Sequence, residues 1–200
     1  MTMQMVSRLV VLAVTGAVAT SAQADLVVDS GLGLALDVEF TVGSGEQTSY
    51  MVVDFAATGG DSYAFAYQYS QFAGARSYDM LLAVTDAMQG LSWDFGGEDG
   101  VGFGVFTNNF TYLGDTGDEL NFWSFSLGVV DDPGIVWEGA GVGVSGRFLS
   151  EGSLDGWYNG FNPDFSTIPP TAPLTAIPAP GALLVMLGGG ALAGTRRRRH

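Results

Sequence analysis

The clearest pattern in the chain is an alternation of apolar residues with polar or small ones. It covers residues 34–42 and predicts a strand with one buried face. Residues 50–57 and 62–69 are two further predicted strands, and the Thr-Gly-Gly-Asp sequence at 58–61 between them indicates a hairpin loop. In residues 62–69 the large aromatic residues occupy alternate positions, so they are expected to share one face of the strand.

A single helical pattern follows these strands. Ser77 can cap the helix, Asp79 suits its first turn, and Gly90 is expected to end it. Its apolar stripe consists of Met80, Leu81, Val84 and Met88.

The remainder of the middle segment again predicts strands. A turn is expected at Asn108 and Asn109. The fold class is therefore α+β, mostly antiparallel β with one packed helix, in a β-grasp-like or sandwich-like arrangement over residues 25–165. The Pro/Thr-rich residues 166–176 are expected to form a semi-extended spacer that does not pack. The further predicted strands are residues 91–95, 101–107, 110–113, 122–127, 135–137, 142–149 and 154–158.

Part of this segment resembles a known class of small domain. Trp123-Ser124-Phe125, followed by residues 149–157, is similar to the closing half of β-grasp domains related to the C-terminal region of transcobalamin. The resemblance covers about residues 75–160 and implies a β-grasp-like fold. Leu127-Gly128 stands where those domains have Asn-Gly, so no cofactor binding is carried over.

The first 24 residues have the pattern of a secretory signal peptide. Arg8 supplies a positive charge, residues 9–19 form an apolar run, and Ala22 and Ala24 form a small-x-small cleavage site before Asp25. The apolar run is too short to span a bilayer. We therefore expect a signal helix that is removed by signal peptidase.

The last 24 residues, 177–200, combine three elements in a fixed order. Pro178, Ala179 and Pro180 come first, and the apolar residues 181–195 follow as a predicted transmembrane helix. As a helix, residues 177–195 would reach about 28 Å, near the thickness of the hydrocarbon core. The terminal basic cluster is expected to stay in the cytoplasm, and it consists of Arg196, Arg197, Arg198 and Arg199.

This order resembles the PEP-CTERM sorting signal, although Ala179 stands where the family has its central Glu. The resemblance implies an exosortase-like transpeptidase of a Gram-negative bacterium as a partner. It also implies transient anchoring in the inner membrane, followed by delivery to the cell surface or extracellular matrix, often alongside exopolysaccharide production. An ordinary C-terminal membrane anchor is the alternative.

Composition narrows the chemistry available to the domain. The chain has 21 acidic and seven basic residues, a net charge of −14 and no cysteine, and its one histidine is His200. All the acidic residues, but only Arg76 and Arg147 among the basic ones, lie between residues 25 and 165. Such a surface repels nucleic acid. Thiol, Ser-His-Asp and Schiff-base chemistry are excluded, and we expect a protein that is not an enzyme.

A carboxylate pair is the remaining catalytic alternative. Two acids about 5–10 Å apart across a cleft would suffice for glycoside hydrolysis. With 21 acidic residues, such a pair also arises by chance. The candidates are Asp94, Glu98, Asp99, Glu138, Glu151 and Asp155.

Two binding functions remain open beside that of a structural matrix component. No cofactor is expected, but Asp115, Asp118 and Glu119 are oxygen ligands in a turn that suit calcium. Exposed aromatic rings would suit stacking on a surface polysaccharide, giving a binding or calcium-dependent adhesion module. The proposed stacking residues are Tyr63, Tyr67, Trp123 and Trp137.

Overall fold

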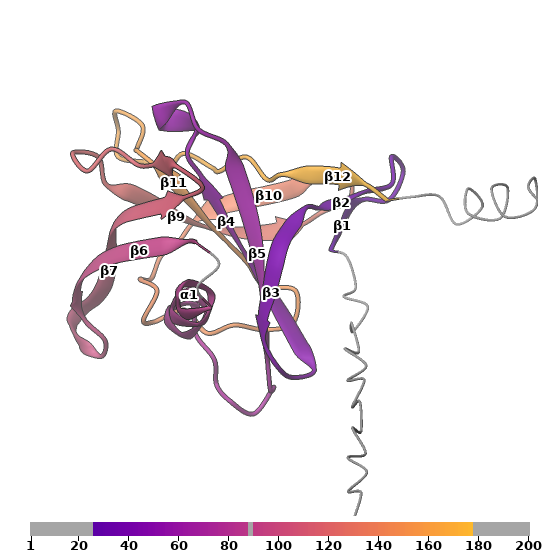
Figure 1. Ribbon diagram of the computed structural model, residues 1–200, viewed down its shortest axis with the longest axis horizontal. Coiled ribbons are helices and arrows are strands. Elements are labelled where there is room, and N and C mark those ends of the chain that lie inside the picture. Colours follow the sequence, from indigo (N-terminus) through magenta and orange to yellow (C-terminus); the bar gives the residue numbers. More distant parts are fainter. Residues whose placement is uncertain (1–25, 88–89, 178–200) are drawn as a thin grey trace, which may run out of the picture.

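A six-stranded mixed sheet forms the middle layer of the domain (Figure 1). The computed structural model describes residues 26–87 and 90–177. Within the sheet β11 is parallel to β4 and β3 is parallel to β5, whereas the other neighbouring pairs are antiparallel. In spatial order the strands are β10 (Ile135–Gly139), β9 (Trp123–Val130), β11 (Leu154–Asn159), β4 (Gln47–Asp54), β5 (Ser62–Tyr69) and β3 (Val38–Gly43).

Strand β4 is buried on both faces. Because successive side chains point to opposite faces of a strand, Met51 and Val53 enter one apolar cluster and Tyr50 and Val52 enter another. A continuous apolar run is what a strand between two cores requires. The sheet is therefore covered on both sides.

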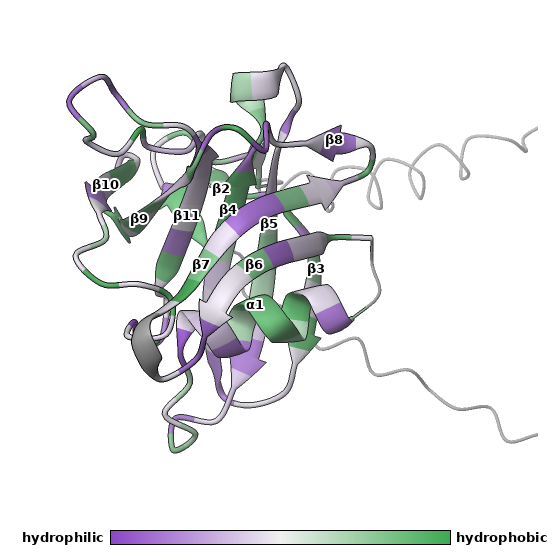
Figure 2. Cartoon of the chain, turned by 90° about the vertical axis from the view of Figure 1, so that its left-hand side faces the viewer, coloured by the Kyte–Doolittle hydropathy of each residue, from purple (hydrophilic) through white to green (hydrophobic). Residues whose placement is uncertain are grey.

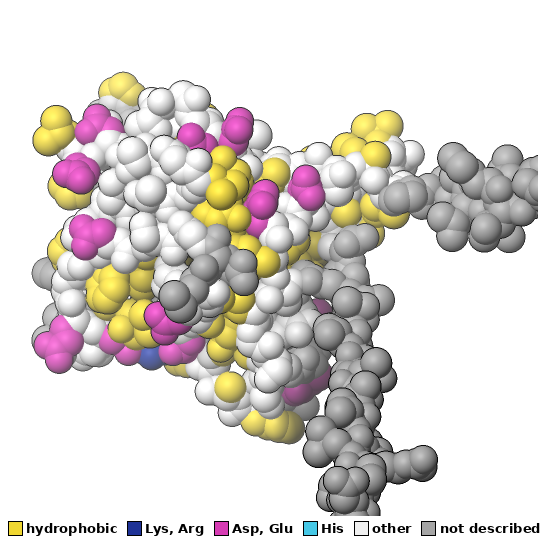
Figure 3. Space-filling model, viewed as in Figure 1, with side chains coloured by type: hydrophobic (Ala, Val, Ile, Leu, Met, Phe, Trp, Pro, Cys, Tyr) yellow, Lys and Arg dark blue, Asp and Glu magenta, His cyan; other side chains and the backbone are white. Residues whose placement is uncertain are grey.

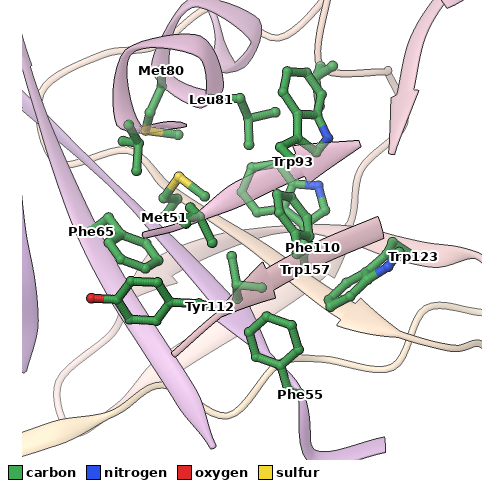
Figure 4. Packing of buried hydrophobic residues seen from close by; sticks show 14 of the residues in the cluster. Met51, Phe55, Phe65, Met80, Leu81, Trp93, Phe110, Tyr112, Trp123 and Trp157 are labelled. Carbon is green, nitrogen blue, oxygen red and sulfur yellow. The ribbon is translucent and has the colours of Figure 1, made fainter. Parts of the chain in front are cut away.

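One side is covered by a helix and a long hairpin (Figure 2). The larger core lies beneath them, where Met51, Phe65, Met80, Phe110 and Trp157 meet (Figure 4). The elements of this layer are α1 (Ser77–Asp86), β6 (Ser92–Glu98), β7 (Val101–Tyr112) and β8 (Asp115–Thr116), and the short 3-10 helix η1 (Ala56–Thr58) follows β4.

Helix α1 begins differently from the sequence expectation. Its N-cap is Arg76, whose backbone N–H donates to the Asp79 carboxylate at 2.8 Å. Ser77 is not the cap, because its hydroxyl donates instead to the buried carboxylate of Asp155. The helix ends at Asp86, with Ala87 as its C-cap, and not at Gly90 as expected, while Met88 of the predicted stripe lies outside the described residues.

The other side of the sheet is covered by a three-stranded sheet of β1 (Val27–Asp29), β2 (Leu34–Leu36) and β12 (Leu174–Ala176). Both β1 and β12 pair with β2. The two ends of the described chain, Leu26 and Ile177, therefore lie at the same side of the domain, on the right in Figure 1.

The Pro/Thr-rich segment corrects our expectation of an unpacked spacer. Pro170 is buried, and the backbone N–H of Thr171 donates to the Asp54 carboxylate at 2.7 Å. The carbonyl oxygen of Thr171 accepts a hydrogen bond from Ser62, and the segment ends in β12. Its backbone groups find partners along the sheet, which a solvated linker would not supply.

Two local predictions are wrong. Asn108 and Asn109 are not a turn but lie inside the twelve-residue β7, where a register shift opposite Asp94 and Phe95 gives a β-bulge. Residues 142–149 form a loop with one isolated bridge, between Phe148 and Arg76, rather than a strand.

The fold class is confirmed at the coarse level: a β-rich α+β domain with mixed sheets and one helix. The predicted signal helix and the predicted transmembrane helix lie outside the described residues. Within 26–87 and 90–177, no helix is long and apolar enough to cross a bilayer.

Trp137 packs over two glycines of the central sheet. A Cβ atom added to Gly128 would lie 2.9 Å from the indole, and one added to Gly156 would lie 2.6 Å from it and 2.5 Å from Pro170 Cγ. The Trp137 ring and Pro170 thus occupy the space that side chains on β9 and β11 would otherwise fill.

Gly156→Ala is expected to lower the free energy of unfolding by about 1–3 kcal/mol, because the methyl group overpacks this contact. Gly141→Ala is the matched control, since a Cβ there meets nothing within 4 Å. Its stability should change by less than about 0.5 kcal/mol or rise slightly. Urea denaturation midpoints measure both, and equal midpoints would contradict the packing role of Trp137.

Candidate functional site

An open cleft of about 700 Å³ lies at the end of the domain opposite β1, β2 and β12. Three segments far apart in sequence form it: the middle of β7, the stretch that enters β9, and the loop that follows β11. Its lining residues are Phe106, Thr107, Leu120, Asn121, Phe122, Trp123, Gly160, Phe161, Asn162, Pro163 and Phe165.

The walls of the cleft expose large apolar side chains to an unusual degree. Phe122 is 77% exposed, Phe165 86% and Leu120 90%, and Phe106 and Phe161 are also exposed. Single exposed apolar residues are ordinary, but a group that converges on one hollow marks a binding surface. Figure 3 shows hydrophobic and acidic side chains beside one another at this left-hand end of the molecule.

Trp123 lines the cleft but is itself buried, so it forms the floor of the cleft. Figure 4 shows its ring among those of the larger core. Its indole N–H donates to the Asn109 side-chain oxygen at 3.3 Å, and its ring meets Phe55 and Phe110 edge-on. A Cβ added to Gly117 would lie 2.4 Å from the same ring. The floor is therefore held rigidly from three sides.

Asn159, at the end of β11, fixes one wall. Its buried side-chain oxygen accepts the Asp118 N–H at 2.8 Å, and its amide nitrogen donates to the carbonyl oxygens of Asp118 and Asn121 at 3.3 Å. Three hydrogen bonds to one side chain thus hold the segment that carries Leu120 and Phe122.

The opposite wall is a tight loop that holds Phe165 in a left-handed backbone conformation, with φ 64°. The Phe165 N–H donates to the Asn162 carbonyl at 2.9 Å, and Ser166 donates to the Asp164 carboxylate from both its N–H and its hydroxyl. These bonds lower the pKa of Asp164, the Ser166 hydroxyl most strongly. A bulky residue with positive φ is rare and is strained, and such strain gathers at functional sites.

Two smaller hollows adjoin the cleft. One of about 230 Å³ shares Phe106, Trp123 and Phe161 with it and is mainly apolar. The other, of about 300 Å³, shares Asn121 and Phe122 and is polar. Its own lining residues include Asp94, Asn108, Asn109 and Glu119.

The four aromatic residues proposed from the sequence do not share an open face. Trp123 alone lines the cleft, and it is buried. Tyr63 and Tyr67 are half-buried against the larger core, and Trp137 packs into the smaller core on the other side of the sheet.

The candidate calcium ligands are engaged with the protein. Asp115 accepts hydrogen bonds from the Asp61 N–H at 2.9 Å and from the Tyr63 hydroxyl at 2.8 Å. Asp118 accepts from the Leu120 N–H and from the Asn121 amide, whereas Glu119 is exposed. Across the described residues, no group of three acidic or histidine side chains is arranged to hold a metal.

Four of the six candidate hydrolase carboxylates are bound to other groups of the protein. Asp155 is fully buried against Ser77 and Arg147, and this burial raises its pKa. Asp99 is paired with Arg76, whose hydrogen bond lowers the pKa of the carboxyl. Glu151 accepts the Thr48 N–H, Asp94 accepts from Asn108, and Glu98 and Glu138 are exposed on β6 and β10.

Sequence reasoning missed the exposed aromatic residues of the cleft. Phe161 and Phe165 lie in Gly-Phe-Asn-Pro-Asp-Phe, residues 160–165, where turn-forming residues surround two large rings. An aromatic residue in such a loop cannot enter a regular core easily, and this was the available signal. Neither a family model, nor a curated protein, nor a solved structure matches this chain.

Burial, together with the hydrogen bond to Asp115, raises the pKa of Tyr63 to about 12. Because an unfolded tyrosine titrates near 10, the folded state holds this proton more tightly. The stability that Tyr63 contributes should be complete below about pH 10 and should disappear as the pH rises to about 12. Urea midpoints between pH 9 and 12 should therefore fall more steeply for the wild type than for Tyr63→Phe, and parallel curves would contradict this.

Phe165→Gly is expected to stabilise the protein by about 0.5–1 kcal/mol, because glycine relieves the left-handed strain at an exposed position. Leu113→Gly should do the same, since Leu113 is also exposed and has φ 51°. Phe72→Gly is the control: Phe72 is 88% exposed without a positive φ, so this variant should not gain stability. Thermal unfolding of the three variants decides this, and a loss of stability in Phe165→Gly would contradict the strain argument.

Proposed function

We propose that this is an exported, exosortase-processed protein of the cell surface or extracellular matrix of a Gram-negative bacterium. The observation that carries the proposal is the agreement of the two ends of the sequence. The signal peptide exports residue 25 onward, while the Pro178–Pro180 element, the apolar span and the arginine cluster retain the end in the inner membrane until it is processed.

We further propose that the domain acts by binding and is not an enzyme. In support, the cleft is lined by aromatic, aliphatic and amide side chains, while the candidate carboxylates Asp94, Asp99, Glu151 and Asp155 are hydrogen-bonded to the protein. This favours a polysaccharide-binding module over a purely passive matrix component. The packing of α1 across a mixed sheet is compatible with a β-grasp-like fold.

The position of the cleft supports a role in presenting a binding surface. In Figure 1 the loop after β11 lies at the upper left, whereas β1, β2 and β12 lie on the right. The chain thus leaves the domain at the end away from the cleft, so that a membrane or surface attachment beyond residue 177 would leave the cleft open.

The mature protein recovered from a host with an exosortase is expected to begin at Asp25 and to lack the apolar and arginine segments beyond residues 178–180. N-terminal sequencing and intact mass measure the two ends separately. Replacing Arg196 to Arg199 with alanine should leave the first cleavage unchanged and impair the second. A mature N-terminus at Met1 would contradict export, and a tail retained in that host would contradict exosortase processing.

A further inference from the structure

The cleft and its two adjoining hollows form one continuous surface. The apolar hollow shares Phe106, Thr107, Trp123 and Phe161 with the cleft, and the polar hollow shares Thr107, Asn121 and Phe122 with it. Thr107 lines all three hollows, so an apolar part and a part that carries amides and carboxylates lie beside one another on this surface. Three joined hollows have room for several units of a chain.

The lining combines flat aromatic rings with amide groups that can accept further hydrogen bonds. The amide nitrogens of Asn121 and Asn162 donate to Asp118 and Ser166. Their amide oxygens accept no hydrogen bond from any other residue in the described part of the chain, and both residues are exposed. A ligand with apolar faces and hydroxyl groups at its edges would use both features, and a sugar ring has this form.

The charge around the surface selects among such ligands. Asp94 and Glu119 line the polar hollow. Asp118 and Asp164 are close in sequence to residues that line the cleft. No arginine lines any of the three hollows. Within the described residues the two arginines, Arg76 and Arg147, are paired with Asp99 and Asp155. A polyanionic chain would be repelled by these carboxylates, so the surface favours a ligand that carries no negative charge.

We propose that this surface binds an uncharged polysaccharide chain, whose sugar rings stack on Phe106, Phe122 and Phe165 while its hydroxyl groups bond to the Asn121 and Asn162 amides. The proposal rests on the proposed function, because such a polymer lies outside the cell. The left-handed strain at Phe165 supports it independently, since glycine would remove the strain and also the ring.

The test uses the full-length protein, in a detergent without a sugar headgroup, and cellohexaose as the probe. This neutral β-linked oligosaccharide has only equatorial substituents, so both faces of its rings are apolar. Titration calorimetry should detect binding, and the double variant Phe122→Ala/Phe165→Ala should weaken it by at least about tenfold. The matched control Phe72→Ala/Phe148→Ala removes two exposed rings outside the cleft and should leave the affinity unchanged.

A second arm tests the charge argument with an oligoglucuronate of similar length. It should bind more weakly than cellohexaose at low salt, and added salt should narrow the difference. Equal or tighter binding of the oligoglucuronate at low salt would overturn the proposal. So would an equal loss of cellohexaose binding in both double variants.

Binding of the apolar dye anilinonaphthalene sulfonate without any binding of cellohexaose would also overturn it, and would identify a docking surface for an apolar partner. Total absence of binding to any probe has the same consequence. The mature N- and C-termini are measured independently, so failure of the glycan proposal and failure of export or sorting give different results.

Discussion

Burial of both faces of β4 is the constraint on which the rest of the domain depends. Tyr50 and Val52 need an apolar layer on one side and Met51 and Val53 need one on the other, so a helix with a hairpin and a small sheet must both cover the strand. β11 meets the same requirement alongside it, since its Leu154 and Trp157 enter opposite cores. The shared burial therefore explains why a strand from late in the chain is inserted next to β4.

The two pairings of β11, with β4 on one side and with β9 on the other, set the geometry of the cleft. β11 lies parallel to β4, with Leu154 opposite Tyr50 and Tyr158 opposite Asp54. Asn159 therefore lies at a defined position at the end of the strand. From there its side chain holds residues 118–121, and the chain continues into the loop that carries Phe165. The segment that carries Leu120 and Phe122 and the loop that carries Phe165 are thus both anchored at the end of the buried strand β11.

The period of the apolar residues correctly predicted the elements in which one regular pattern runs through the whole segment. The β4–β5 hairpin and α1 follow from alternation and from a helical stripe, and both are present. The adjacent Asn108 and Asn109 predict a turn that would divide β7, whereas a bulge accommodates them within the strand. The cleft was beyond such reasoning, since its three segments meet only through long-range contacts, among them the β11–β9 pairing that sets Asn159 opposite Trp123. The period along a strand also cannot distinguish an aromatic residue over glycines, such as Trp137, from one that faces solvent.

The distribution of polar interactions separates the domain into an internally satisfied body and an exposed end. The two arginines of the body form ion pairs with Asp99 and Asp155. Among the buried polar side chains of the described residues, only the Ser126 hydroxyl has no hydrogen-bond partner. The cleft differs from this body in both respects. Apolar rings lie in solvent, two amide oxygens accept no hydrogen bond from the described residues, and Phe165 is strained. Only the strain at Phe165 lowers the stability of the folded protein, because the exposed rings and amide oxygens meet water in the folded and unfolded states alike. Rings that converge on one hollow beside a strained backbone therefore fit the proposed binding surface better than a requirement of folding.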